Sequence, residues 1–304
     1  MTDLPFPFPN QQTPDGDDVY FDHLAWMVAD MDAASSVFEK LGFVLTPYSV
    51  HGHRDPETGE RIPQGTANRL AMLDTGYIEL LCEVGGVEAP VVDDLRARLK
   101  RYTGVHLLAF SHADADSAYG RIEEDGFRLQ PMVNLRRDVE AADGSDDEVK
   151  FSVIRAKFDE IPEGRIQVLT HHTPDLMWQD RYLARDNGLT AMVDGIICVS
   201  DPRDSAERMA KFLAKSAKVI DEDEVHVVTE RGGLRFITRS RVEDYVPGFE
   251  PSSLPYTLGI GFLSGDLDKT RAFYANAGVS LKETDMALVI APEDALGTAL
   301  LIYK

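Results

Sequence analysis

The pattern of hydrophobic and polar positions repeats four times along the chain. Each copy begins with a short apolar run typical of a β-strand, reaches a small or acidic residue that can cap a helix, and continues with apolar positions three or four residues apart. The copies are residues 21–43, 104–127, 193–213 and 258–279. An aspartate recurs nine, ten, nine and nine residues after a reference position in the four first strands, with His23, His106, Gly195 and Gly259 as references and Asp32, Asp116, Asp204 and Asp268 as the acids. This recurrence indicates an internal repeat.

Further strand-like segments follow each predicted helix. They are Phe43–Val50, Ala67–Asp74 and Tyr77–Val84 in the first copy, Phe127–Met132, Lys150–Ala156 and Arg165–Thr170 in the second, a less regular strand near Lys218 with Val225–Thr229 and Leu234–Thr238 in the third, and Ser280–Glu283, Met286–Ala291 and Thr298–Tyr303 in the fourth. The unit is therefore β-α-β-β-β, and one unit cannot bury its sheet face alone. We expect an α+β protein of four βαβββ modules that form two paired-module domains.

The connections between copies indicate where these domains begin and end. Residues 90–102 predict a helix between the first two copies, and the polar, aromatic-bearing stretch 173–189 separates the second from the third. We expect an extended arm over residues 1–18, which hold four prolines, modules 1 and 2 over 19–186, and modules 3 and 4 over 187–304. The charged stretch 134–149, with its Gly-Ser turn, predicts a mobile loop.

Composition and charge exclude several classes of protein. The chain has 304 residues, 43% of them hydrophobic, which is enough for two cores, and no apolar run approaches the ~20 residues of a membrane span. Its 31 basic and 52 acidic residues give a net charge of −21, which disfavours nucleic acid and anionic membranes as partners. Cys82 and Cys198 cannot form a disulfide framework, and the first residues do not resemble a secretory signal. We expect a cytoplasmic protein.

Candidate chemistry is concentrated in the first two copies. His23 and Glu79 lie on the first and last strands of copy one, and His106 and Gln167 hold the corresponding positions in copy two. The same positions hold Gly195 and about Phe236 in copy three, and Gly259 and about Leu300 in copy four. Nitrogen and oxygen ligands that converge from two curled sheets favour a divalent metal site in the amino-terminal half.

Three segments resemble one known family. The repeat, together with DHLAWMV at 22–28, GTANRLAML at 65–73 and GYIELL at 76–81, resembles the vicinal oxygen chelate superfamily, and within it the glyoxalase-like domain proteins. The resemblance extends from about residue 20 to the end of the chain. It implies that paired modules form a cup with one divalent ion (Fe, Mn, Ni or Zn) at its base, held by His23, Glu79, His106 and Gln167. The sequence departs from glyoxalase I at Gln167, because that enzyme has a proton-moving glutamate there and glutamine cannot act as a base.

Other polar residues could complete the chemistry. His171 and His172 end the last strand of module 2 and point to opposite faces, so one could replace the missing base; we take His172, with Glu79, as the catalytic candidates. Asn68 and Arg69, on the strand before Glu79, are candidates for binding a substrate oxygen.

The resemblance implies a metal-dependent isomerase or lyase of the glyoxalase type, which acts on a small oxygen-bearing molecule through an enolate-like intermediate. One alternative is a non-haem Fe(II) ring-cleaving dioxygenase, since two histidines and a carboxylate are also the ligand set of those enzymes. Another is a metal-free protein that binds or sequesters a small molecule. A homodimer in which the cup closes across two chains is a further possibility.

Overall fold

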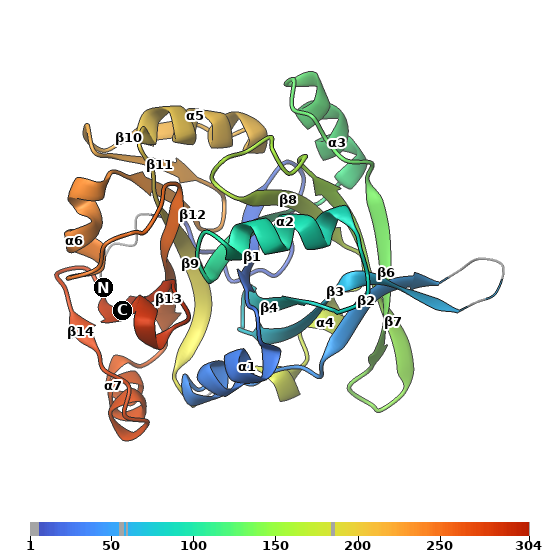
Figure 1. The fold of residues 1–304 in the computed structure, drawn as a ribbon, viewed down its shortest axis with the longest axis horizontal. Coiled ribbons are helices and arrows are strands. Elements are labelled where there is room, and N and C mark those ends of the chain that lie inside the picture. The colour runs from blue at the N-terminus through green and yellow to red at the C-terminus, as the bar shows by residue number, and fades with distance from the viewer. Residues whose placement is uncertain (1–5, 55–57, 59, 184–185, 304) are drawn as a thin grey trace.

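Two eight-stranded mixed sheets make up the protein (Figure 1). The computed structural model describes residues 6–54, 58, 60–183 and 186–303. Sheet A has the strand order β2-β3-β4-β1-β5-β8-β7-β6, and sheet B has the order β10-β11-β12-β9-β13-β16-β15-β14. In each sheet two βαβββ modules meet at an antiparallel pair of first strands, β1 with β5 and β9 with β13. The predicted α+β class and the predicted two pairs of modules are confirmed.

The bounds of the elements follow the repeat. Sheet A consists of β1 (Val19–Met27), β2 (Ser49–Arg54), β3 (Arg61–Met72), β4 (Tyr77–Glu83), β5 (Gly104–His112), β6 (Val133–Glu140), β7 (Asp146–Arg155) and β8 (Arg165–His171), with helices α1 (Met31–Lys40), α2 (Pro90–Leu99) and α3 (Ala115–Glu124). The bridge to sheet B holds α4 (Pro174–Met177) and the 3-10 turn η1 (Asp180–Tyr182).

Sheet B repeats the arrangement with shorter outer strands. It consists of β9 (Leu189–Cys198), β10 (Ala217–Val219), β11 (Glu224–Val228), β12 (Gly233–Ile237), β13 (Tyr256–Ser264), β14 (Lys282–Glu283), β15 (Leu288–Ile290) and β16 (Ala299–Tyr303), with helices α5 (Pro202–Leu213), α6 (Val242–Tyr245) and α7 (Leu267–Asn276) and the 3-10 turns η2 (Arg239–Arg241) and η3 (Pro292–Asp294).

An aspartate caps the long helix of each module. The side chains of Asp30, Asp114, Asp201 and Asp266 accept hydrogen bonds from backbone N–H groups of the first turns of α1, α3, α5 and α7. The recurring acids of the sequence pattern lie two or three residues further on, in the same first turns, where a negative charge interacts favourably with the helix dipole. The repeat therefore marks the end of each first strand and the start of each helix.

The prediction of a mobile loop over residues 134–149 is wrong, because this stretch forms most of the β6–β7 hairpin. The two strands pair from Val133–Val153 to Glu140–Asp146. Along β6 half-buried and exposed residues alternate, and Leu135 and Val139 pack against a core cluster. Alternation with period two is the signal of a strand with one solvated face, and the high charge of that face concealed it. The strand expected at Phe127–Met132 begins at Val133 instead.

The two sheets share a large hydrophobic cluster. The largest buried cluster contains residues of both halves, and Phe43 of module 1 contacts the ring of Phe262 in module 4. The indole N–H of Trp26 donates to the backbone oxygen of Ala295 at 3.1 Å, and Thr298 Oγ1 accepts from the backbone N–H of Val105 at 3.0 Å. The strands of sheet A end at His171 and those of sheet B begin at Leu189, and the division into two domains near residue 186 stays a prediction.

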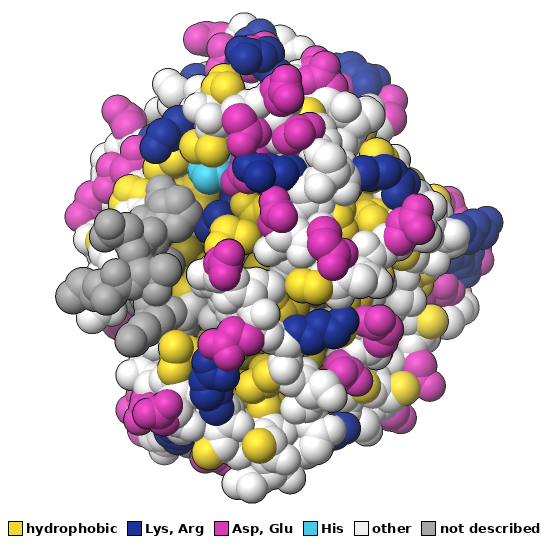
Figure 2. Space-filling view, turned by 90° about the vertical axis from the view of Figure 1, so that its left-hand side faces the viewer, with side chains coloured by type: hydrophobic (Ala, Val, Ile, Leu, Met, Phe, Trp, Pro, Cys, Tyr) yellow, Lys and Arg dark blue, Asp and Glu magenta, His cyan; other side chains and the backbone are white. Residues whose placement is uncertain are grey.

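The amino-terminal arm packs on sheet B. Phe6 is only 3% exposed and lies in a cluster with Tyr245 and Tyr256. Charged side chains of both signs are interspersed with small apolar areas on the face shown in Figure 2. None of the helices within the described ranges is long and apolar enough to cross a membrane.

Candidate functional site

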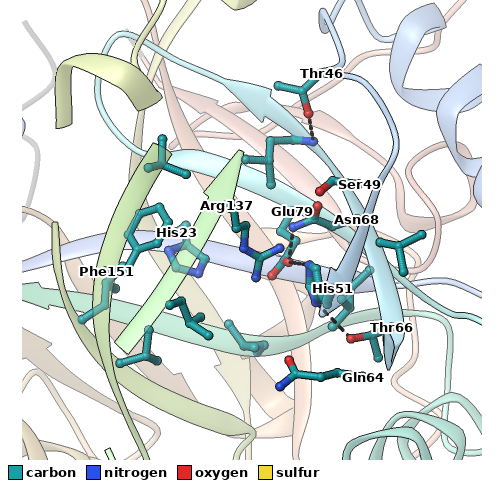
Figure 3. A pocket seen from close by; sticks show the side chains of 18 of the residues that line it. His23, Thr46, Ser49, His51, Gln64, Thr66, Asn68, Glu79, Arg137 and Phe151 are labelled. Atoms are coloured by element: carbon teal, nitrogen blue, oxygen red, sulfur yellow. Dashed lines mark hydrogen bonds and ion pairs between the residues drawn. The ribbon is translucent and has the colours of Figure 1, made fainter. Parts of the chain in front are cut away.

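One face of sheet A lines a cavity of about 1010 Å³, which we call the sheet A cup (Figure 3). All eight strands contribute side chains to it, at the two-residue spacing that places them on one face. The bridge adds Leu176, Met177 and Tyr182. A cavity of this size, mostly apolar with a few convergent polar groups, is typical of a small-molecule site.

Glu79 is held on one wall of the cup by neutral partners. Its side chain belongs to a residue only 8% exposed, and Asn68 Nδ2 donates a 2.6 Å hydrogen bond to Glu79 Oε1. His51 Nε2 lies 3.7 Å from the same oxygen, and His51 Nδ1 lies 3.0 Å from Thr66 Oγ1. Burial and the nearby charge of Arg137 lower the pKa of His51 well below its ordinary value, so His51 is neutral near pH 7. Asn68 thus lies in the cup and orients Glu79, and its role in binding a substrate oxygen stays a prediction.

His23 is positioned by an aspartate that sequence reasoning missed. Asp22 lies at a β-bulge of β1 and is fully buried. Its carboxylate oxygens lie 2.8 Å from His23 Nδ1 and 3.0 Å from His171 Nε2. Burial alone would raise the pKa of Asp22, but the charge and hydrogen bond of His171, with those of His23, hold it far below the usual range. On its other side, His23 Nε2 lies 3.2 Å from Gln167 Nε2 in the cup.

The expected pair of His23 and His106 is not formed. On β1, His23 pairs with Tyr77, and on β5 the equivalent pair is Leu107 with Arg165, so Leu107 holds the position that matches His23. His106 therefore points to the opposite face, where Nε2 lies 2.8 Å from the backbone oxygen of Tyr102 and burial lowers its pKa to about 4. The signal was present in the sequence: the offset of ten residues from His106 to its aspartate becomes nine when it is counted from Leu107.

Two further candidates lie outside the sheet A cup. Arg69 is on the helix side of β3, where Nε donates to the backbone oxygen of Thr46 at 2.9 Å and Nη1 donates to Ser35 Oγ at 3.0 Å. His172 is exposed, and its Nε2 lies 2.8 Å from Ser152 Oγ. His171, not His172, is the buried member of that pair. Neither side chain lines the cup, so the structure does not support a substrate-binding role for Arg69 or a catalytic role for His172.

Three arginines contribute positive charge to the cup. Arg137 of β6, Arg155 of β7 and Arg165 of β8 all line it, and Arg165 is only 8% exposed. Burial, together with the charges of Arg165 and Arg137, lowers the pKa of Arg155 to about 10, which leaves it charged at neutral pH. Sequence reasoning overlooked these side chains, although the spacing of two residues between Arg165 and Gln167 places both on one face of β8.

Comparison with known proteins identifies the family. The sequence profile of a family described as glyoxalase-like domain matches residues 21–213, which is more than half of the chain. The chain belongs to the glyoxalase-like domain family. The predicted relationship to the glyoxalase-like domain proteins is confirmed, and no curated protein sequence matches the chain.

Solved structures share the architecture of this glyoxalase-like domain protein. A hypothetical protein from Staphylococcus aureus is 11% identical with a TM-score of 0.64, covering 93% of this chain and 98% of that chain. A mutant of 4-hydroxymandelate synthase from Streptomyces coelicolor is 14% identical with a TM-score of 0.55, and the match covers 94% of this chain and 93% of that chain. A xylose isomerase-like TIM barrel/4-hydroxyphenylpyruvate dioxygenase fusion protein is 13% identical with a TM-score of 0.51, and the match covers 89% of this chain and 40% of that chain. At these identities the similarity shows the fold alone.

The side chains of this glyoxalase-like domain protein do not fit the divalent ion that the superfamily resemblance implies. His106 faces away from the cup, and Leu107 stands at its expected position. Gln167 is neutral and is hydrogen-bonded to His23, and the three arginines of the cup repel a cation. Across the described residues, no three His, Cys, Asp or Glu side chains form a group that could hold a metal ion. No reaction step is therefore assigned to a metal.

Proposed function

We propose that this glyoxalase-like domain protein binds a small oxygen-bearing organic molecule in the sheet A cup, through its own side chains and without a resident divalent ion. The observation that carries the proposal is the cavity of about 1010 Å³, in which apolar walls surround the polar side chains of Glu79, His23 and Gln167. Apolar walls bind the body of a ligand, and a few placed polar groups orient its oxygens.

A variant that places a bulky side chain in the cup tests this function. Ser49 lines the cup at the start of β2, and Ser49→Trp should obstruct it, whereas Ser36→Trp on the exposed face of α1 is a matched control. Keto acids and hydroxy acids, the neutral amides of both, and phenols would be screened in EDTA by thermal shift, and binding would be confirmed by calorimetry. We expect at least one compound to stabilise the wild type and Ser36→Trp but not Ser49→Trp. Binding that requires added metal, or that survives Ser49→Trp, contradicts the proposal.

A second candidate function, proton-transfer catalysis of the isomerase or lyase class, is favoured by the contacts of His23. With its Nδ1–H directed at Asp22, His23 presents Nε2 as an acceptor in the cup, where the Gln167 amide donates to it. A buried carboxylate in this relation fixes the tautomer and orientation of a histidine that takes up a proton. For a compound that the EDTA-treated protein turns over, His23→Gln should lower kcat and leave Kd almost unchanged.

Restoring the missing ligands tests the assignment of a metal-free site. Leu107→His and Gln167→Glu together would place an imidazole and a carboxylate at the positions that match His23 and Glu79. We expect the wild type to bind Zn²⁺ and Ni²⁺ weakly and the double variant to bind them on the order of 10²-fold more tightly. The loss of a residue that merely supports a metal ligand already changes metal affinity on this scale. Competition with a chromophoric chelator measures both. Tight, stoichiometric metal in the wild type would show that the cup rearranges to hold it.

A further inference from the structure

Arg155 and Arg165 of the sheet A cup indicate the charge of its ligand. We propose that the bound molecule is an organic anion with an apolar body, whose carboxylate or similar oxyanion lies against Arg165 and Arg155. This inference rests on the proposed function and adds the chemical class of the ligand.

The hydrogen-bonding state of the two guanidinium groups carries the inference. Among the described residues, neither Arg155 Nε nor Arg165 Nε has a hydrogen-bond partner, although both atoms are buried. The Arg165 guanidinium lies over the ring of Phe158, with its central carbon 5.5 Å from the ring centroid, and a contact with a ring face gives Nε no hydrogen-bond acceptor. Buried donors without acceptors are costly, so the chain compensates these two guanidinium charges poorly, and an anion in the cup would complete their surroundings.

The neighbouring charges do not neutralise these arginines. Glu79 is the buried carboxylate of the cup, and Asn68 already holds it at 2.6 Å. Asp94, which also acts on Arg165, forms a 2.9 Å ion pair with Arg98. Glu88, Asp138 and Glu140 lie at the exposed rim, where water screens them. Arg155 and Arg165 against Glu79 leave an excess of positive charge at this end of the cup.

The geometry of the strands places the two arginines beside each other. Arg155 ends β7 opposite Gln167 of β8, and Arg165 is two residues from Gln167 on the same face. The planar guanidinium group, with its fixed fork of N–H donors, matches the two oxygens of a carboxylate. Apolar side chains also line the cup and suit a hydrocarbon or aromatic body: Leu81, Leu107, Val149, Phe151, Val153 and Leu169.

Matched pairs of small acids and amides test the charge of the ligand. Benzoate and 3-phenylpropanoate, with benzamide and 3-phenylpropanamide as neutral partners of similar shape, would be titrated into the wild type by calorimetry in EDTA. Arg165→Met and Arg155→Met remove the charge and keep much of the volume, and Arg136→Met is the control, because Arg136 is exposed on β6 and lies outside the cup.

We expect each acid to bind the wild type and Arg136→Met at least tenfold more tightly than its amide. Arg165→Met should weaken acid binding by about 10- to 100-fold, the loss typical of hydrogen bonds to a charged group, and leave amide binding unchanged. Arg165→Met should also raise the unfolding midpoint, because it removes a buried charge that lacks a full set of partners.

The possible failures are distinguishable. Acids and amides that bind equally, in a manner blocked by Ser49→Trp, overturn the anion assignment and leave the proposed function intact. Arg165→Met and Arg155→Met could instead weaken acid and amide binding equally and lower the unfolding midpoint. That result would assign the arginines a structural role and would also overturn the anion assignment. Binding of neither class, here and in the wider screen, overturns both proposals.

Discussion

Replacing Asp194 with alanine is expected to lower the free energy of unfolding by about 3–5 kcal/mol, the usual cost of removing one partner of a buried ion pair. Asp194 is fully buried on β9, and Arg235 Nε donates to its carboxylate at 2.6 Å while the Tyr303 hydroxyl donates at 3.1 Å. Burial alone lowers the pKa of Arg235, but the charge of Asp194 outweighs it and raises that pKa above the usual range. Without Asp194 this cation would remain buried and uncompensated. Urea denaturation followed by circular dichroism measures the loss.

A double variant separates the ion pair from the space it fills. Asp194→Leu with Arg235→Met replaces both charges by apolar groups, and it should recover most of the stability that the single change loses. Room is limited, because a Cβ on Gly261 would already lie 1.9 Å from Asp194 Oδ1. If the double variant is as unstable as Asp194→Ala, the loss comes from packing and not from charge. Ligand binding in the sheet A cup should survive in every variant that folds.

The pair of Asp194 and Arg235 also shows where sequence reasoning about the repeat fails. The strand register matches Asp194 to His23, and Arg235 to Glu79, because Gly233 pairs with Asp194 as Tyr77 pairs with His23. The sequence alignment placed Gly195 and Phe236 at these positions, one residue away in each case. It therefore predicted a second half without polar groups, whereas sheet B has an ion pair covered by Phe6, whose ring lies 5.4 Å from the Arg235 guanidinium.

The fold was predictable because it depends on features that tolerate such an error. Strand and helix periodicity, the capping aspartates and the spacing between copies are unchanged when an alignment slips by one residue. The predicted direction of a side chain does change, because a shift of one residue moves it to the opposite face of the strand. His106 and Phe236 were misplaced for this reason, and Glu79 and Gln167 were placed in the cup because their strands aligned without a gap.

Other parts of the site depend on contacts that no local pattern specifies. Asp22 acts through a bulge that turns its side chain toward His23 and His171, and a bulge breaks the simple alternation of a strand. The arginines come from three strands of module 2, and Arg137 lies in the stretch that was expected to be a loop. Their convergence with Glu79 appears only when the eight strands are assembled into one sheet.

Replacing Asp22 with alanine should lower the free energy of unfolding by about 2–5 kcal/mol at pH 7, because the imidazole groups of His23 and His171 both lose their buried acceptor. Asp32→Ala, in the exposed first turn of α1, is the control and should change stability by no more than ~0.5 kcal/mol. Denaturant titrations of the wild type and both variants measure these differences.

The difference between the wild type and Asp22→Ala should also depend on pH in a defined direction. The folded pKa of Asp22 lies far below its unfolded value near 3.8, so its stabilising contribution is complete above about pH 4 and is lost progressively as the pH falls toward the folded pKa. The gap in unfolding free energy should therefore be widest from pH 5 to 7 and narrow between pH 4 and 2. A gap that stays constant down to pH 2 would show that Asp22 contributes packing alone, and the orientation of His23 for proton transfer would then need another cause.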